Sequence, residues 1–269
     1  MTRWKEILGA NERTNELEPI GVIDVGSNSV RLLVAEYGPH SGLTVVDEVK
    51  EQPRLAHGVA QTGRLHPDAM DRAIEALGRM KNVAERRGAS RIQAVATSAV
   101  REATNGAEFV ARVKEATGLD LRIIDGDTEA SVVRLAALRE LPGTPDDAVV
   151  IDIGGGSSEL SWTEGRESTE LGVMRLTERH VHVDPAGAAT LAELRRVVRA
   201  RLDRLPLPTQ CPYLVGSSAT CAVLARLQLA LPRHDRDRIH GLEIATPALT
   251  ARAEQLADLD LAARRALPG

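Results

Sequence analysis

The sequence predicts an α/β protein made of two similar halves, each with a mixed sheet and a repeated order of elements. The main reason is a sequence motif that occurs twice. Residues 22–29 read Val-Ile-Asp-Val-Gly-Ser-Asn-Ser, and residues 150–157 read Val-Ile-Asp-Ile-Gly-Gly-Gly-Ser. In each motif a short apolar run ends in an aspartate and is followed by a glycine-rich turn. Since the offset is close to half of the 269-residue chain, two equivalent strand–turn–strand units are expected.

The second reason is the order of elements in the first half of the chain. Alternating apolar residues predict three strands, after which helical and extended patterns alternate, with Gly88 as the C-terminal cap of the first helix. The elements expected in this half are strands 20–25, 29–37 and 43–51, helix 68–87, strand 92–96, helix 105–117, strand 121–124 and helix 128–140.

The same order starts again after residues 141–147, where two prolines and a glycine indicate a turn or linker. The elements expected in the second half are strands 148–153, 158–163 and 167–173, helix 188–204, strand 213–215 and helix 218–229. We therefore predict a βββαβαβα order in both halves. The domains that we predict are a polar leader over 1–19, a first domain over 20–133 and a second domain over 134–269. Because the second half ends before its last crossover, we expect the chain to lack a C-terminal segment.

Composition limits the class of protein and its partners. Hydrophobic residues make up 43% of the chain and charged residues 27%, which is typical of a globular protein. No apolar run approaches the ~20 residues that span a bilayer, and the first residues are polar, without the apolar core of a secretion signal. The net charge of −4 provides no general attraction for nucleic acid, and Cys211 and Cys221 fit neither a disulfide framework nor a zinc knuckle. We expect a cytoplasmic protein with no nucleic-acid and no membrane partner.

The aspartates at the two strand ends, Asp24 and Asp152, are candidate metal ligands. Carboxylate oxygens suit Mg²⁺, which keeps several waters and needs only one or two protein carboxylates beside substrate phosphates. One such aspartate alone is more simply explained as a cap of the following turn, but two in matching contexts favour the metal. The backbone N–H groups of the turns would then bind the phosphate that the metal bridges.

The run Gly154-Gly155-Gly156-Ser157-Ser158 is the candidate phosphate-binding turn. It is not a Walker loop, since no Gly-Lys-[Ser/Thr] follows, and it is not a dinucleotide fingerprint, since no helix follows. A tight hairpin that needs positive φ angles is the alternative, but three glycines exceed that need. Glu159 comes two residues after Ser157 on the same strand face. It either reaches a metal-bound water or is an exposed strand residue.

Two further segments follow strands, where ligand sites of α/β proteins form. Arg101 offers a planar guanidinium that can clamp a phosphate, with a surface ion pair as the alternative. Glu129 lies in the first turn of an expected helix. It is either a reactive carboxylate or a residue whose negative charge interacts favourably with the helix dipole. Asp127 or Thr128 is then the N-cap of the helix. A third strand–turn–helix, over Gly216–Thr220, is a weak signal on its own.

Together these motifs resemble the exopolyphosphatase and guanosine pentaphosphate phosphatase family, in its short two-domain form. The resemblance covers residues 20–245 and departs at Ala219 and at the C-terminal helices. It implies two ribonuclease H-like lobes of the actin-like ATPase superfold, with the active site in the cleft between them. It also implies Glu129 as the general base, with Mg²⁺ or Mn²⁺ held by Asp24, Asp152 and Glu159. The phosphate contacts that it implies are Ser27, Asn28, Arg101, Gly155, Gly156, Ser157 and Ser158.

The function expected from this resemblance is Mg²⁺-dependent hydrolysis of the terminal phosphate of linear polyphosphate, by a water that Glu129 activates. The first alternative is the same chemistry on the 5′-triphosphate of guanosine pentaphosphate. The second is a non-hydrolytic actin-like module that binds ATP or polyphosphate, against which the intact Glu129, Asp152 and Glu159 argue. We also expect a homodimer.

Overall fold

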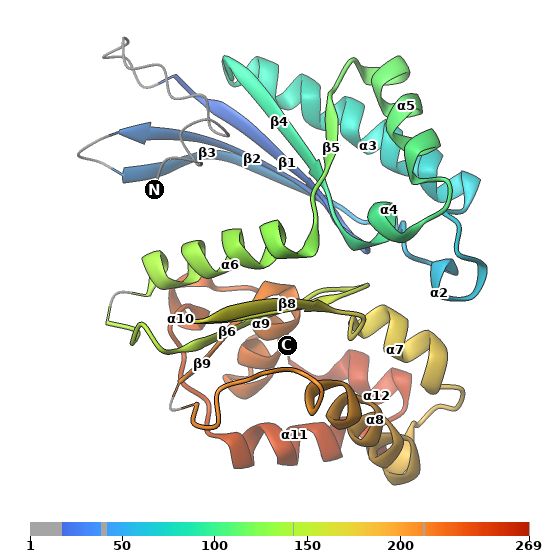
Figure 1. Cartoon of the computed structure of the whole chain (residues 1–269), viewed down its shortest axis with the longest axis vertical. Coiled ribbons are helices and arrows are strands. Elements are labelled where there is room, and N and C mark those ends of the chain that lie inside the picture. Colours follow the sequence, from blue (N-terminus) through green and yellow to red (C-terminus); the bar gives the residue numbers. More distant parts are fainter. Residues whose placement is uncertain (1–17, 39–41, 142, 212, 269) are drawn as a thin grey trace.

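The structure is a computed structural model that describes residues 18–38, 42–141, 143–211 and 213–268. It contains two mixed α/β domains, one above the other along the long axis of the molecule (Figure 1). Within the described residues, the first domain has a five-stranded sheet and the second a four-stranded sheet. The predicted fold class, two α/β domains each built on a mixed sheet, is confirmed. All but the last two residues of the predicted leader, 1–19, lie outside the described residues.

The sheet of the first domain has the strand order β3-β2-β1-β4-β5. β1 pairs antiparallel with β2 and parallel with β4, as expected for a meander followed by crossovers. The elements of this domain are β1 (Ile20–Val25), β2 (Val30–Gly38), β3 (Gly42–Glu51), α2 (Val59–Thr62), α3 (Pro67–Arg86), β4 (Arg91–Ala96), α4 (Ser98–Glu102), α5 (Gly106–Thr117) and β5 (Leu121–Ile123).

The core of the first domain lies between this sheet and the helices α3 and α5 (Figure 1). Val25 of β1, Leu77 and Met80 of α3 and Phe109 of α5 are all fully buried. Burial of one side chain of this size stabilises the fold by ~1.5–3 kcal/mol. The core therefore fixes the end of β1, and with it the position of Asp24.

The sheet of the second domain has the strand order β8-β7-β6-β9, with β6 antiparallel to β7 and parallel to β9. β6 thus has the place that β1 has in the first domain. The elements of this domain are α6 (Gly126–Glu140), β6 (Val149–Ile153), β7 (Ser158–Trp162), β8 (Gly165–Thr169), α7 (Val173–His180), α8 (Gly187–Leu202), β9 (Leu214–Ser217), α9 (Ser218–Gln228), α10 (Arg236–Ile239), α11 (Thr246–Asp258) and α12 (Leu261–Ala266).

Helix α6 connects the two sheets and packs on the second one. Val133 and Leu138 pack against a cluster that contains Val150, and Arg134 donates from Nη1 to the carbonyl of Ala148 at 2.8 Å. Helix α6 contacts all four strands of the second sheet, whereas the predicted boundary divides the helix after residue 133. The exact limits of the domains stay a prediction.

Parts of the chain depart from the predicted order. The predicted strand 167–173 ends at Thr169, and helix α7 begins at Val173. After α9 the described chain continues as helices α10, α11 and α12, so the fifth strand of the second βββαβαβα unit has no counterpart among the described residues. The helices α2 and α4 were not predicted, because runs of four and five residues carry no helical periodicity.

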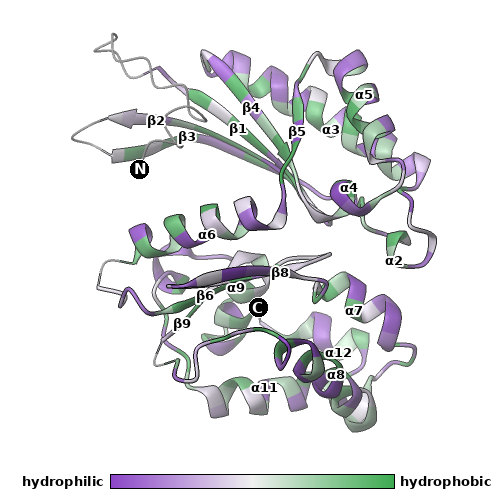
Figure 2. Ribbon diagram, viewed as in Figure 1, coloured by the Kyte–Doolittle hydropathy of each residue, from purple (hydrophilic) through white to green (hydrophobic). Residues whose placement is uncertain are grey.

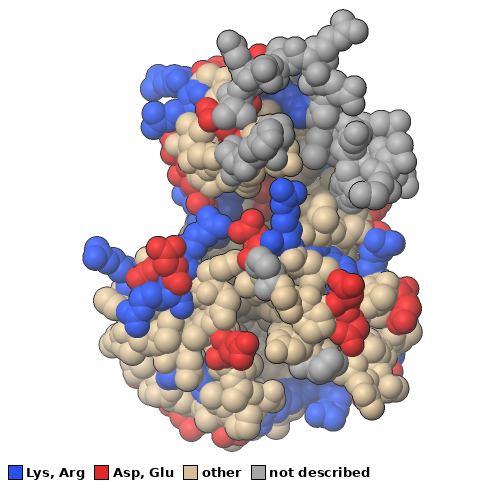
Figure 3. Space-filling view, turned by 90° about the vertical axis from the view of Figure 1, so that its left-hand side faces the viewer, with Lys and Arg blue, Asp and Glu red and all other residues tan. Residues whose placement is uncertain are grey.

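The surface carries charges of both signs. Figure 3 shows Lys and Arg interspersed with Asp and Glu, and a narrowing between the two domains. Figure 2 shows hydrophobic residues along β1 and β5 and hydrophilic residues on α8, at the outside of the second domain. No helix in the described part of the chain has the length and apolar character needed to cross a membrane.

Candidate active site

The two repeated turns have the same backbone geometry. In the first turn the Gly26 N–H donates to the carbonyl of Ser29 at 3.0 Å, and in the second the Gly154 N–H donates to the carbonyl of Ser157 at 3.0 Å. Each turn links the central strand of its domain, β1 or β6, to an antiparallel neighbour. The repeated sequence motif therefore forms the same turn in both domains.

The two turns come from different domains and lie against each other. A Cβ atom added at Gly156 would lie 2.5 Å from the Ser27 Oγ and 2.6 Å from the Ser98 Oγ, so a larger residue would push the turns apart. None of the glycines 154–156 has a φ angle in the left-handed region. The alternative of a hairpin that needs positive φ is wrong, because these glycines serve close approach.

Helix α7 binds the carbonyl groups of the glycine turn from one side. The Val173 N–H donates to Gly154 at 2.9 Å, the Met174 N–H to Gly155 at 2.9 Å and the Arg175 Nε to Gly156 at 2.8 Å. The Arg175 N–H adds a longer bond to the Gly155 carbonyl, at 3.3 Å. At the start of the helix, a Cβ on Gly172 would lie 2.2 Å from the carbonyl carbon of Gly156. The first turn of α7 is therefore pressed directly against the glycine turn.

This arrangement directs backbone N–H groups away from α7. Because C=O and N–H point in opposite directions in a planar trans peptide, fixing the three carbonyls aims the N–H groups of Gly155, Gly156 and Ser157 to the other side. None of these three N–H groups has a hydrogen-bond acceptor among the described residues. In the first turn, the carbonyls of Ser27 and Asn28 are held in the same way by the N–H groups of residues 56 and 54, at 2.8 and 3.1 Å. Oriented and unpaired N–H groups of this kind bind anions.

Two carboxylates face each other beside the glycine turn. Asp152 on β6 and Glu159 on β7 are directly opposite in the antiparallel register, which places their side chains on the same face of the sheet. Glu159 is 3% exposed, and its carboxylate accepts a hydrogen bond from the Ser168 Oγ at 2.7 Å. The alternative of Glu159 as an exposed strand residue is therefore wrong. Two carboxylates this close repel each other unless a proton or a cation lies between them.

The surroundings raise the pKa of both predicted aspartates. Burial raises the pKa of Asp24 to about 6, against an opposing effect of the Arg31 guanidinium on the neighbouring strand. Burial and then the charge of Glu159 raise the pKa of Asp152 to about 6, although a hydrogen bond from Ser217 lowers it. Protein atoms crowd around the Asp24 carboxyl and raise its pKa, yet part of the side chain still reaches solvent. Its charge raises the pKa of Asp152 and of Glu129 in the second domain, so Asp24 lies on the wall of a cleft between the domains.

Glu129 is carried into this cleft by the first turn of α6. The N-cap of the helix is Asp125, whose carboxylate accepts from the Thr128 N–H at 2.7 Å, and not Asp127 or Thr128 as considered above. The Glu129 Oε2 accepts from the Arg101 Nη1 at 2.9 Å, which joins α6 to α4 of the first domain. The two side chains are only 17% and 22% exposed, so this contact is not a surface ion pair.

The electrostatics of Glu129 suit proton transfer. Burial and the charge of Glu159 raise the pKa of Glu129 to about 7, Arg101 lowers it, and Asp24 raises it further. A carboxyl group that titrates near neutral pH can accept a proton from water and release it again. The alternative, a surface glutamate that only interacts with the helix dipole, does not account for the burial of the Glu129 side chain.

The donor set fits a magnesium ion that is bound mainly through substrate. No three His, Cys, Asp or Glu side chains converge on one metal position in the described part of the chain. Mg²⁺ does not need such a cage, because one or two carboxylates with phosphate oxygens and waters complete its coordination. The facing pair Asp152 and Glu159 supplies two such carboxylates, and Asp24 adds negative charge from the other domain.

The structure brings together most of the predicted phosphate contacts. Ser27 and Asn28 lie in the first turn, and Gly155, Gly156 and Ser157 in the second. Ser158 is different, because its hydroxyl donates to the carbonyl of Leu171 at 2.9 Å and its side chain is 3% exposed. The Ser158 hydroxyl thus ties β7 to the segment before α7, and its role as a phosphate contact stays a prediction.

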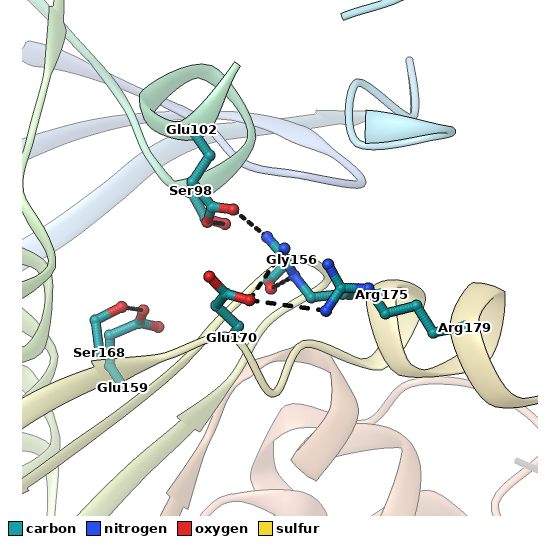
Figure 4. A network of polar contacts seen from close by, with 8 residues as sticks. All are labelled: Ser98, Glu102, Gly156, Glu159, Ser168, Glu170, Arg175 and Arg179. Atoms are coloured by element: carbon teal, nitrogen blue, oxygen red, sulfur yellow. Dashed lines mark hydrogen bonds and ion pairs between the residues drawn. The ribbon is translucent and has the colours of Figure 1, made fainter. Parts of the chain in front are cut away.

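Several residues at the site were missed by sequence reasoning. They are Arg31, Ser98, Glu102, Ser168, Gly172 and Arg175. Figure 4 shows that Arg175 extends from α7 to the α4 residues Ser98 and Glu102. Among these residues only Gly172 carries a local signal in the sequence, a glycine directly before a helix. The other residues make contacts between segments that are far apart in the sequence.

Comparison with known proteins adds the family. The sequence model of the Ppx/GppA phosphatase family matches residues 33–269. The chain belongs to this family. Its membership confirms the resemblance described above, and it makes the protein a phosphatase, as predicted for the enzyme class.

Named relatives and solved structures agree with this assignment. Exopolyphosphatase 2 of Mycobacterium tuberculosis is 33% identical over 240 residues, which is 83% of this chain and 75% of the relative. The guanosine-5′-triphosphate,3′-diphosphate pyrophosphatase of Vibrio cholerae is 31% identical over 218 residues, which is 77% of this chain and 43% of the relative. The crystal structure of the Aquifex aeolicus family member superposes with a TM-score of 0.74 at 27% identity, and the match covers 91% of this chain and 80% of that one. The actin-like fold is thereby confirmed.

Proposed function

We propose that the protein releases the terminal phosphate of linear polyphosphate, with Glu129 as the general base and Mg²⁺ as the cofactor. The observation that carries this proposal is the setting of Glu129, whose pKa is raised to about 7 within reach of the charges of Glu159 and Asp24. The similarity to an exopolyphosphatase supports the substrate class. The free cysteines of the described chain support a reducing compartment, so we infer a cytoplasmic location.

In the proposed reaction the chain's own groups position phosphate and water. The N–H groups of Gly155, Gly156 and Ser157 bind oxygens of the terminal phosphate, which enters the cleft between the two turns. Mg²⁺, when held by Asp152 and Glu159, supplies positive charge for the phosphate oxygens. Glu129 accepts a proton from the water while the water oxygen forms the new bond to phosphorus.

The bridging P–O bond on the opposite side of the phosphorus then breaks, and the shortened polyphosphate leaves as an anion. Positioning and electrostatic stabilisation provide most of the rate in such transfers, because little covalent chemistry is left to the protein. Arg101 favours the charged form of the Glu129 carboxyl, which accepts the proton of the water, since the guanidinium lowers the pKa that burial raises.

A second candidate substrate is guanosine pentaphosphate. The relative in Vibrio cholerae, named for the guanosine 5′-triphosphate 3′-diphosphate, favours it. Both substrates end in a phosphoanhydride, so the same base and the same N–H groups serve either one.

The test is phosphate release from long polyphosphate, tripolyphosphate, guanosine pentaphosphate and ATP, measured side by side with Mg²⁺. We expect the highest kcat/KM for long polyphosphate, and release by Glu129→Gln that is slower by roughly 10²–10⁴-fold. A higher kcat/KM for guanosine pentaphosphate would favour the second candidate. Tight binding of polyphosphate without any release would instead support a non-hydrolytic binding module.

A further inference from the structure

An ion pair crosses the domain interface next to the glycine turn. Arg175 of α7 contacts the carboxylate of Glu102 on α4 through Nη2, and the two side chains are 9% and 29% exposed. The other carboxylate oxygen of Glu102 accepts from the Ser98 Oγ at 2.6 Å. Figure 4 shows these groups in line, from α4 of the first domain to α7 of the second.

The same guanidinium also binds the phosphate turn. The Arg175 Nε donates to the carbonyl of Gly156 at 2.8 Å, so one rigid planar group connects the carboxylate of Glu102 to this carbonyl. Glu170 adds a longer contact, with its Oε2 at 3.7 Å from the Arg175 Nη1. Because the guanidinium cannot bend, the position of Glu102 decides where the Nε of Arg175 lies.

The bond to the Gly156 carbonyl has a consequence for the next N–H group. In the planar peptide between Gly156 and Ser157, the N–H of Ser157 points opposite to the carbonyl that Arg175 binds. A peptide between glycine and serine without this bond can rotate more freely, since glycine accepts many backbone angles. Arg175 therefore selects the orientation in which the Ser157 N–H faces away from α7.

We propose that Arg175 is a positioning residue that presents the Ser157 N–H to the terminal phosphate, and that it does so only when Glu102 of the first domain is in place. The proposal rests on the proposed function, in which this N–H binds the phosphate. It makes the contact between the domains a condition for a complete phosphate site. Phosphate release is then confined to the arrangement in which α4 and α7 touch.

Space around the pair supports this role. The cavity beside it, lined by Ser98, Gly156 and Arg175 among others, holds about 10 Å³, the room of a single water. The Arg175 side chain is only 9% exposed, so protein atoms surround it on nearly all sides. The guanidinium is thus fixed by packing as well as by charge, which is what accurate positioning of a neighbouring group needs.

The test uses Arg175→Met, Glu102→Gln, the double variant, and Arg179→Met as a matched control. Arg179 lies one turn further along α7, is 42% exposed, and pairs only with Glu170 among the described residues. We expect Arg175→Met to lower kcat for polyphosphate about 100-fold with KM changed less than about threefold, as for loss of one oriented donor. Glu102→Gln should lower kcat about tenfold, and the double variant should match Arg175→Met, because Glu102 acts through Arg175. Arg179→Met should keep kcat within about twofold of the parent.

Hydrogen exchange on the ligand-free proteins separates this inference from the proposed function. The hydrogen-bonded amides of Gly154, Val173 and Met174 should exchange at least tenfold faster in Arg175→Met and Glu102→Gln than in the parent, and at the parent's rate in Arg179→Met. If the parent releases no phosphate from any substrate, the proposed function fails while this exchange still tests the coupling. If Arg175→Met does not fold, Glu102→Gln alone carries the test. Parental kcat in a folded Arg175→Met, multiplicative losses in the double variant, or unchanged exchange would each overturn the inference.

Discussion

Replacing Asp152 with asparagine should make the metal-free protein more stable at pH 8, although it removes a candidate metal ligand. The pKa of Asp152 is raised from 3.8 to about 6 in the folded protein, so the folded state binds this proton more tightly than the unfolded state. The free energy of unfolding of the parent must then fall as the pH rises from 3.8 to about 6. Below that window the group has no effect, and above it the full cost of the buried charge remains.

The size of the effect comes from the shift itself. A rise of about two pKa units corresponds to about 3 kcal/mol. That is a large share of the ~5–15 kcal/mol that stabilises a typical protein. Asparagine keeps the shape of the side chain and an acceptor for Ser217, which hydrogen-bonds to Asp152 in the parent. Asp152→Asn should therefore gain most of this free energy above pH 6 and none below pH 4.

Urea denaturation in EDTA at pH 4 and at pH 8 measures the difference. Asp127→Asn is the control, because the Asp127 side chain is 76% exposed and its charge carries little burial cost. Titration with Mg²⁺ at pH 8 should then stabilise the parent more than Asp152→Asn, since a ligand stabilises only the state that binds it. An Asp152→Asn protein that is less stable than the parent at pH 8 in EDTA would refute the argument from burial.

Three further outcomes concern activity. Glu129→Gln should lower kcat for phosphate release by roughly 10²–10⁴-fold with little change in substrate binding; turnover within about threefold of the parent would remove Glu129 from the mechanism. The kcat/KM of the parent should rise as the pH increases through about 7, because the raised pKa leaves Glu129 protonated below that value; a profile that is flat from pH 5.5 to 8.5 would contradict the assignment. Gly156→Ala should lower activity strongly, since its Cβ would lie 2.5 Å from the Ser27 Oγ. Gly78→Ala, whose Cβ meets only a methyl group at 3.9 Å, should keep full activity, and equal losses in both would show that the close approach is not needed.

The parts of the fold that the sequence predicted are those with local periodicity. The strands around Asp24 and Asp152 and the long helix α3 follow from apolar patterns within each segment. Helix α7 was missed because it begins only a few residues after β8 and has eight residues, and the alternation of Leu171 and Val173 continues an extended pattern. The fifth strand of the second domain was expected from the duplication, and the described chain has helices instead.

The candidate site divides in the same way. The repeated turns identified the phosphate region from spacing alone, whereas Glu129 needed the family resemblance, because a glutamate in a first helical turn is ordinary. Arg175 and Glu102 are 73 positions apart, and no local pattern joins them. Ser158 was included because a hydroxyl beside a glycine turn has the right chemistry, and only the structure shows that this hydroxyl donates to the carbonyl of Leu171.

Helix α6 has a consequence for how mutations in this protein will behave. The helix packs with the second domain, while the Arg101 that faces Glu129 is carried by the first domain. Arg101 also donates to the carbonyl of Ile124 at 2.9 Å, and Ile124 and Asp125 form the connection from β5 to α6. A substitution in this short connection would misplace Glu129, the proposed base, even when both domains fold normally. Loss-of-function alleles that leave the amount of protein unchanged are therefore expected at residues 124–125 as well as in the phosphate turns, and a survey of variants that records abundance and activity separately would find them there.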